Sequence, residues 1–143
     1  MNFKKLNDFA IEPTKGSAAA AGWDLYAAFE GESIEIPAHE TRMIGTGLAI
    51  ELPTGTFGAI FARSGLASKQ GLRPANCVGV VDSDYRGEVK VALHNDSDVV
   101  RIVEPQERIA QLVIMSYYQT QLNEIEELSD TERGESGFGS TGV

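Results

Sequence analysis

Polar groups suited to phosphate binding stand together at Arg63, Ser64 and Gly65. An arginine can donate two parallel hydrogen bonds to phosphate oxygens, and a glycine lets the backbone approach an anion closely. Ser64 is expected to cap a helix over 66–70 that Gly71 ends, and the first amides of a helix attract anions. The segment predicts a phosphate site, although taken alone it more often means a capped helix with a surface arginine.

The segment from Asn76 to Gly87 has the pattern of a hairpin with two carboxylates, Asp82 and Asp84, and the ring of Tyr85 at its far end. The Asn76 amide and strand backbone groups match the acceptor, donor, acceptor edge of uracil, whereas cytosine would leave polar groups unpaired. This predicts a base-binding slot between the two arms. In isolation, a hairpin closed by Asp and Gly is more often only a turn.

Two polar side chains interrupt otherwise apolar segments. Gln111 lies in the segment 107–114, within a strand that is otherwise apolar from 109 to 115, and Asp24 lies in 21–28 beside Trp23 and Tyr26, which suit a core or an interface better than a ligand platform. A buried amide or carboxylate needs partners, either neighbouring backbone groups or a bound ligand. In isolation, bonding to neighbouring backbone is the commoner case for Gln111, which could instead point into a site and donate to a phosphate oxygen, and Asp24 poses the same question.

The glycine-rich end, residues 133–142, offers amides that can converge on an anion, and Arg133 adds charge. Phe138 can stack on a base, a contact worth about 1–3 kcal/mol. The segment lacks the lysine and the following helix of a P-loop. By itself it is more often a disordered tail.

Short strands must position these groups. Much of the sequence from 33 to 115 has the pattern of short strands, clearest at 33–37, 47–52, 89–93 and 109–115, with turn residues at 53–55, 86–87 and 94–96. This predicts an all-β jelly-roll or small barrel in which helix is a minor component. After Tyr118 the chain becomes acidic and then glycine-rich, and we expect this part to be mobile in the free protein.

The overall composition limits the class of protein. A chain of 143 residues with 42% hydrophobic content fits one globular domain, and its formal charge of -9 repels a nucleic acid polymer. The lone Cys77 cannot form an internal disulfide, and with His39 and His94 it does not make a structural zinc site. No apolar run has the length of a signal peptide or a membrane span, so we expect a cytoplasmic protein.

Five segments taken together resemble the signature motifs of the trimeric dUTP pyrophosphatase (dUTPase) family. They are Ala-Gly-Trp-Asp-Leu from residue 21, Arg-Ser-Gly-Leu-Ala from 63, Gly-Val-Val-Asp-Ser-Asp-Tyr-Arg-Gly from 79, Glu-Arg-Ile-Ala-Gln-Leu from 107 and Arg-Gly-Glu-Ser-Gly-Phe-Gly-Ser-Thr-Gly from 133. The resemblance covers most of the chain, and the third and fifth segments are the most specific. It implies a distorted jelly-roll, or β-clip-like barrel, over 1–143 as one domain, with a flexible arm over about 124–143.

The resemblance also implies a homotrimer that hydrolyses dUTP to dUMP and pyrophosphate, keeping uracil out of DNA and supplying dUMP for dTMP synthesis. Each active site would combine the first, second and fourth motifs of one subunit, the third motif of a second and the tail of the third. Asp82 would activate a water that attacks the α-phosphorus in line. The required Mg²⁺ would be held by the triphosphate and waters, with no direct protein ligand.

The remaining roles are carried over residue by residue. The residues implied in uracil and deoxyribose binding are Asn76, Gly79, Val80, Val81, Tyr85 and Lys90, with Tyr85 packed against the sugar. Those implied in phosphate binding are Arg63, Ser64, Gly65 and Gln111, with Asp24 in support near Arg63 or the metal shell. The tail would close with Phe138 over uracil and with Arg133, Gly139, Ser140 and Thr141 at the outer phosphates.

Three positions depart from the commonest family pattern: Trp23 stands where tyrosine is usual, Ala62 where proline is frequent and Ser136 where glycine is common. None removes a contacting group, but a side chain at Ser136 can restrict the tail. Two other functions remain open. A dCTP deaminase, or a bifunctional deaminase and pyrophosphatase, would need a glutamate near the base, and a catalytically idle nucleotide sensor would usually have lost a motif.

Overall fold

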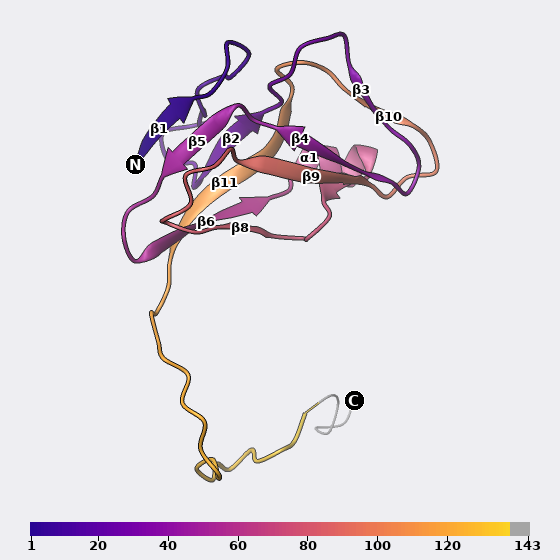
Figure 1. Cartoon of the computed structure of the whole chain (residues 1–143). Coiled ribbons are helices and arrows are strands. Elements are labelled where there is room, and N and C mark those ends of the chain that lie inside the picture. The colour runs from indigo at the N-terminus through magenta and orange to yellow at the C-terminus, as the bar shows by residue number, and fades with distance from the viewer. Residues whose placement is uncertain (138–143) are drawn as a thin grey trace.

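Eleven strands and one short helix form the computed structural model, which describes residues 1–137 (Figure 1). The elements are β1 Asn2–Lys5, β2 Gly22–Tyr26, β3 Ile34–Ile36, β4 Thr41–Gly45, β5 Leu48–Glu51, β6 Thr56–Phe61, α1 Ser64–Gln70, β7 Leu72–Pro74, β8 Gly79–Val81, β9 Lys90–Asn95, β10 Arg101–Val103 and β11 Arg108–Ser116. The predicted all-β, jelly-roll-like fold with one short helix is confirmed.

The strands form antiparallel ladders around one core. A four-stranded sheet has the order β2-β11-β6-β8, a three-stranded sheet has the order β4-β9-β7, and β1-β5 and β10-β3 are separate pairs (Figure 1). Fully buried side chains such as Leu25, Ile44 and Leu93 lie in the core cluster. Since β11 pairs with β2 on one edge and β6 on the other, it joins segments far apart in the sequence.

Two parts of the strand prediction were wrong in extent. Strands β1 and β2 lie before residue 33, where no strand was predicted. The turn predicted at 94–96 begins later, because β9 continues to Asn95, which is fully buried. The Asn95 amide donates to the carbonyls of Ile36 and Val99 at 2.9 and 2.7 Å, so this polar residue joins loops instead of exposing a turn.

The predicted hairpin from Asn76 to Gly87 is also wrong as a ladder. Strand β8 pairs with β6, whereas β9 pairs with β4 and β7, so the two arms belong to different sheets. Each arm buries its own apolar side chains, Val81 in β8 and Val91 and Leu93 in β9, against the shared core. The separation of the arms leaves space between them that a hydrogen-bonded hairpin would close.

Helix α1 ends as predicted but begins differently. Gly71 is left-handed, with φ of 69°, and its N–H donates to the Ala67 carbonyl. The N-cap is the extended residue Arg63 and not Ser64, which is already helical and makes no capping hydrogen bond. Beyond the helix, the Asp96 N–H donates to the Gly71 carbonyl at 2.8 Å.

A charged pair next to Gly71 holds the end of α1. The Arg73 guanidinium hydrogen-bonds to the Asp96 carboxylate, which lowers the pKa of that carboxyl below its ordinary value and raises the pKa of Arg73. Charge on Arg73, and on His94 and His39 when they are protonated, acts in the same direction on Asp96. The helix is therefore anchored at its C-terminal end, and its first residues, Ser64 and Gly65, are exposed.

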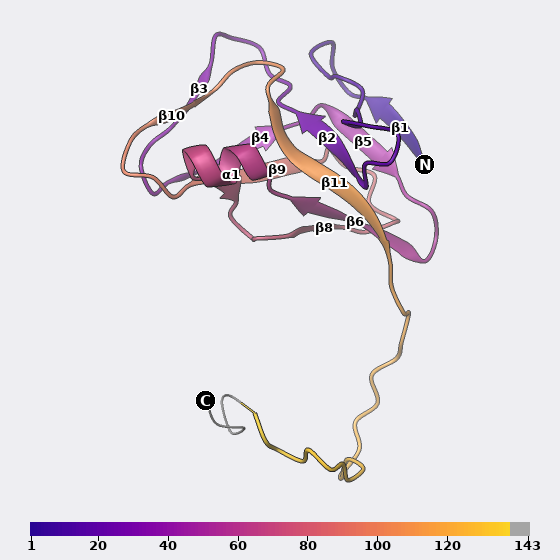
Figure 2. The ribbon, with the colours of Figure 1, turned by 180° about the vertical axis from the view of Figure 1, so that it is seen from behind.

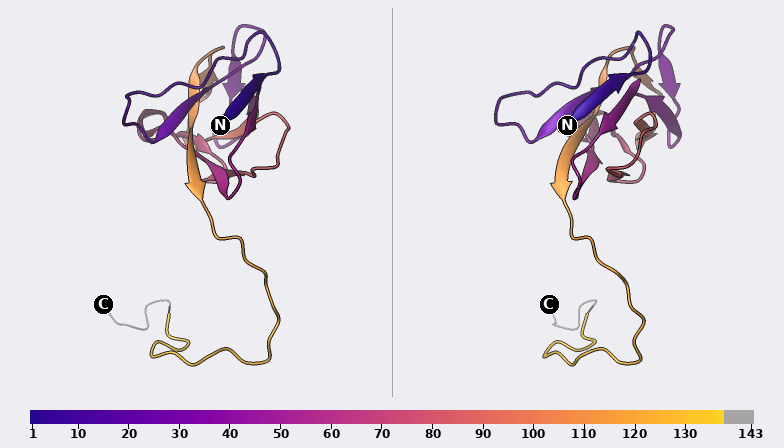
Figure 3. Two further views of the ribbon diagram at one scale, coloured as in Figure 1. Left: turned by 90° about the vertical axis from the view of Figure 1, so that its left-hand side faces the viewer. Right: turned by 60° about the vertical axis from the view of Figure 1, so that its left-hand side comes forward.

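Beyond β11, residues 117–137 form no helix or strand and are almost entirely exposed. Figure 2 shows β11 crossing the body and ending where this segment begins, and both views of Figure 3 show the segment leading away from the strands. Within residues 1–137, no helix has the length and apolar character needed to cross a membrane.

Candidate active site

A buried carboxylate organises the candidate phosphate site. Asp24, in β2, is 5% exposed, and its Oδ1 lies 3.3 Å from Arg63 Nε, at the start of α1. Its Oδ2 accepts a hydrogen bond from Arg108 Nη1 at 3.2 Å, and Gln111 Nε2 donates to Oδ1 at 3.4 Å. A buried carboxylate needs such partners to remain charged. The structure thus brings together Asp24, Arg63 and Gln111, three residues predicted from separate segments.

Arg108 was missed by the sequence analysis, and a β-bulge explains why. In a regular strand, residues three apart face opposite sides, so Arg108 and Gln111 would not both reach Asp24. The ladder between β11 and β2 shifts between Arg108 and Ala110, where Arg108 pairs with Tyr26 and Ala110 with Leu25. Because of the extra residue in β11, Arg108 and Gln111 lie on the same side of the strand. Two polar residues in one apolar strand were the only available signal.

The Arg63 guanidinium is fixed from two directions. Besides its contact with Asp24, it donates from Nη1 to the Arg108 carbonyl at 3.2 Å. Its Nε is buried and, among residues 1–137, has no acceptor in hydrogen-bond geometry, although the distance to Asp24 Oδ1 is in ion-pair range. The side chain keeps a quarter of its surface exposed, next to Ser64 and Gly65. Contacts within the chain therefore hold it in one orientation.

A second group of predicted residues lines a pocket of about 210 Å³ between β8 and β9. The predicted residues in its lining are Asn76, Gly79, Val80, Val81, Asp82, Tyr85 and Lys90. Gly79 packs closely here, because a Cβ there would lie 3.2 Å from Ile60 Cβ, which is a tight contact, and 3.5 Å from Asn76 Nδ2. We call this pocket the nucleoside slot.

The turn after β8 carries the exposed carboxylate of Asp82 at the slot. The Tyr85 N–H donates to the Asp82 carbonyl at 3.2 Å, and the Tyr85 hydroxyl donates to the Glu88 carbonyl at 3.1 Å. The ring of Tyr85 lies directly over Gly87, where a Cβ would contact the hydroxyl and come within 2.6 Å of Cζ. Gly87 thus allows the tyrosine to fold back beside Asp82.

Glu88 also lines the slot and was not predicted. Its Oε1 accepts from the Gly47 N–H at 2.9 Å, and its Oε2 lies 3.3 Å from Lys90 Nζ. A glutamate after the turn glycine gave no distinguishing signal in the sequence. Both of its oxygens already have partners within the chain.

The candidate phosphate site consists of Asp24, Arg63, Ser64, Gly65 and Gln111. It is separate from the nucleoside slot within one chain, since the slot lining includes none of these residues. Arg133 is not with either group. It lies in the extended tail, where its Nε donates to the Ser136 carbonyl at 2.9 Å. The predicted tail residues Phe138, Gly139, Ser140 and Thr141 lie outside the described residues.

The donor set of the described part has no cluster of three or more His, Cys, Asp or Glu side chains that could hold a metal ion. Asp24, the buried carboxylate of the candidate phosphate site, is paired with two arginines. A divalent cation at this site would therefore need most of its oxygen ligands from a bound molecule and from water.

Comparisons with family models, curated proteins and solved structures all find dUTPases. A family model described as dUTPase matches residues 8–142. A deoxyuridine 5'-triphosphate nucleotidohydrolase of Nautilia profundicola is 48% identical over 142 residues, which cover 99% of this chain and 98% of the relative. One of Candida albicans is 51% identical over 132 residues, covering 91% and 80%. The solved structure of Staphylococcus bacteriophage 80alpha dUTPase with dUPNHPP has a TM-score of 0.89 at 30% identity, covering 99% and 98%.

Proposed function

This chain belongs to the dUTPase family, and on that premise we propose how its residues carry out the reaction. It is a dUTP diphosphatase, which hydrolyses dUTP to dUMP and pyrophosphate. The observation that carries the proposed mechanism is that one slot holds Asn76, the edge of β8 and the exposed Asp82 together. The reaction thereby removes the precursor from which uracil enters DNA, and its product dUMP is available for dTMP synthesis.

Uracil binds, in this proposal, against the edge of β8. This strand is at the end of its sheet, so in the described part of the chain one edge pairs with β6 and the other is hydrogen-bonded to no strand. Unpaired backbone groups from Gly79 to Val81 need partners, and the polar edge of uracil supplies them. Asn76 completes the recognition with Lys90, while Tyr85 packs against the deoxyribose.

Asp82 acts as the general base. Its carboxylate accepts a proton from a water whose oxygen attacks the α-phosphorus, and the bond from that phosphorus to the bridging oxygen of pyrophosphate breaks. The phosphate chain lies against Arg63, Ser64, Gly65 and Gln111. Two guanidinium groups against the single carboxylate of Asp24 leave a local surplus of positive charge in a chain of formal charge -9. That surplus favours a triphosphate.

We place each complete site between subunits of a homotrimer. The supporting observations are that the nucleoside slot and the candidate phosphate site are separate within one chain and that the tail leads away from its own body (Figure 3). In the proposed arrangement the nucleoside slot of one subunit faces the candidate phosphate site of a second subunit. The tail of the third, carrying Arg133 and residues 138–141, covers the nucleotide.

Mg²⁺ fits this site as an ion that arrives with the nucleotide. When bound, it neutralises charge on the phosphate oxygens. The protein's own part is to orient the phosphates through Arg63 and Gln111, which Asp24 holds in place. A reducing compartment such as the cytoplasm suits the exposed, free thiol of Cys77.

The experiment that tests the proposal is a substrate panel of dUTP, dTTP, dCTP and UTP, with the mass in solution measured in parallel. We expect pyrophosphate release from dUTP alone and a mass of three chains. Ammonia release from dCTP would support the deaminase, for which Glu88 lines the slot, although its oxygens are engaged by Gly47 and Lys90. No pyrophosphate release at all would support an idle sensor.

A Gly87→Ala variant tests the proposed role of Tyr85. The new Cβ collides with the Tyr85 ring, so the ring must move away from the sugar position. We expect the preference for dUTP over UTP, measured as a ratio of kcat/KM values, to fall about tenfold. The control is Gly16→Ala, where nothing lies within 4 Å. Unchanged discrimination in a folded Gly87→Ala protein would separate Tyr85 from sugar selection.

A further inference from the structure

We propose that Arg86 is a positioning residue that sets the direction of the Asp82 carboxylate, and that Glu51 and Asn2 hold Arg86 in place. The inference rests on the proposed role of Asp82 as the general base. It concerns a side chain that lies outside the nucleoside slot and is assigned no contact with the nucleotide.

Arg86 fixes the shape of the turn that follows Asp82. Its Nη1 donates to the carbonyl of Ser83 at 2.8 Å and to that of Tyr85 at 3.0 Å. The carbonyl of Asp82 itself accepts from the Tyr85 N–H. A single guanidinium therefore joins two carbonyls of the turn that begins at Asp82, and through them it can set the direction of that first residue.

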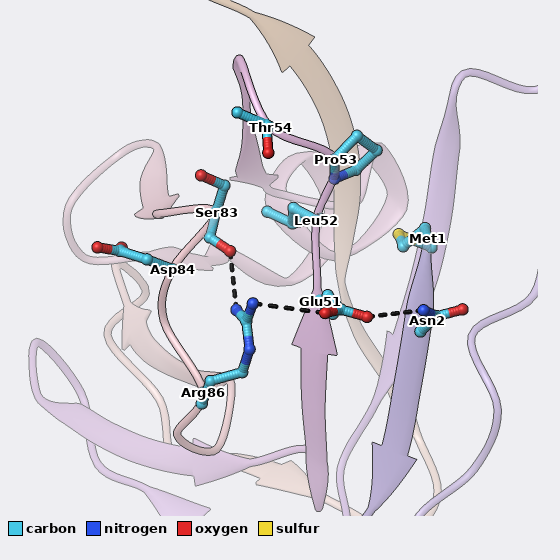
Figure 4. Close-up of a pocket in the computed structure, with 9 residues that line it drawn as sticks. All are labelled: Met1, Asn2, Glu51, Leu52, Pro53, Thr54, Ser83, Asp84 and Arg86. Atoms are coloured by element: carbon cyan, nitrogen blue, oxygen red, sulfur yellow. Dashed lines mark hydrogen bonds and ion pairs between the residues drawn. The ribbon is translucent and has the colours of Figure 1, made fainter.

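The guanidinium is held from outside the turn. Its Nη2 lies 3.6 Å from Glu51 Oε1, at the end of β5, and Glu51 Oε2 accepts from Asn2 Nδ2 at 2.6 Å. Asn2 and Glu51 are directly paired in the ladder between β1 and β5. Figure 4 shows this chain of contacts, with the Arg86 guanidinium between Ser83 and Glu51 and with Glu51 between Arg86 and Asn2.

The two sides of the turn have different environments. Asp82, Tyr85 and Glu88 line the nucleoside slot. Arg86 and Ser83 instead line a larger hollow of about 500 Å³ with Glu51, and the two linings share no residue (Figure 4). Although larger, this hollow lacks Asp82, so we do not assign the chemistry to it. Arg86 therefore acts on the reaction through the backbone of the turn.

Both ends of the Arg86–Glu51 pair are about half exposed, and an exposed ion pair adds little to stability. Its removal should change the rate far more than it changes folding. A displacement of about 1 Å at a reacting group can lower the rate on the order of 10²-fold. A general base that remains present but is less well directed should show a smaller loss.

The test compares kcat and KM for dUTP in full-length Arg86→Met, Arg86→Lys and Glu51→Gln proteins. We expect Arg86→Met to lower kcat about tenfold, with KM changed by less than about twofold, since only transition-state geometry is affected. Arg86→Lys should recover part of the loss because an ammonium can still donate to one carbonyl. Glu51→Gln should lower kcat less than Arg86→Met, and the double variant should match Arg86→Met alone.

Arg42→Met is the matched control. Arg42 also pairs with one carboxylate, Glu40 at 2.6 Å, and donates to one carbonyl, that of Thr41, but it lies on β4 away from the turn. It should keep the unaltered kcat, and all variants should unfold at nearly the same temperature.

An unchanged kcat in folded Arg86→Met overturns the inference, as does a raised KM at unchanged kcat, which would make Arg86 a substrate-binding residue. If Arg86→Met does not fold, unchanged kcat in both Arg86→Lys and Glu51→Gln overturns it instead. Asp82→Asn distinguishes a failure of the positioning role from a failure of the proposed mechanism. Full turnover in Asp82→Asn removes the proposed mechanism itself. Lost turnover in Asp82→Asn, together with unchanged kcat in Arg86→Met, removes only the positioning role.

Discussion

Asp82→Asn is expected to lower dUTP turnover by about 10²–10⁴-fold while dUTP still binds. Asparagine has nearly the shape of aspartate, so the slot lined by Asn76, Tyr85 and Lys90 should remain intact. What is lost is the group that accepts the proton of the attacking water. Pyrophosphate release measures the loss of turnover, and calorimetric titration with a non-cleavable dUTP analogue measures binding.

Asp84→Asn is the matched control for this experiment. Asp84 is an exposed carboxylate in the same turn, two residues away, but it lines the hollow on the other side with Arg86 and not the nucleoside slot. It should keep most of the turnover. If Asp82→Asn turns over dUTP at the unaltered rate, Asp82 is not the base, and the mechanism proposed for this site must be abandoned.

Deletion of residues 133–143 is expected to lower turnover on the order of 10²-fold and to leave the assembled body folded. Within residues 1–137, the buried core cluster extends from Ala10 to Leu112, so the deletion removes none of these core residues. It does remove Arg133 and the tail residues proposed to cover the nucleotide. Without them, bulk water is no longer excluded and the phosphates are less well oriented.

The mass in solution and the unfolding temperature check that the truncated protein is intact, and kcat for dUTP checks the role of the tail. The full-length chain measured in parallel is the reference for all three. A truncated trimer with full activity would show that the tail is not a lid. A truncated protein that no longer assembles would instead assign the tail to the subunit interface.

The sequence predicted candidate site residues and turns wherever the residues involved are close together along the chain. The segment 76–90 contains in one stretch the residues that line the nucleoside slot, apart from Ile60. Gly71 was identified as the end of α1 because only local backbone geometry decides it. The all-β class followed from alternating strands separated by turn residues, which is again a short-range pattern.

Contacts across the fold were not readable in the same way. The bulge that lets Arg108 join Asp24 and Gln111 depends on how β11 registers against β2, which lies more than eighty residues earlier. The contact between Arg86 and Glu51 likewise depends on where the turn lies beside β5. Nothing in the sequence therefore indicated the partners of Arg108 or Arg86.

The sequence by itself determined which side chains are available and that the fold is built of strands. The tertiary structure decided that the arms around Asp82 enter different sheets, so that a slot opens between them, and that Asp24 aligns the side chains proposed to bind phosphate. The physical reason is that strand partners and register are set by burying apolar faces in a common core. That choice depends on the whole chain and not on any one segment.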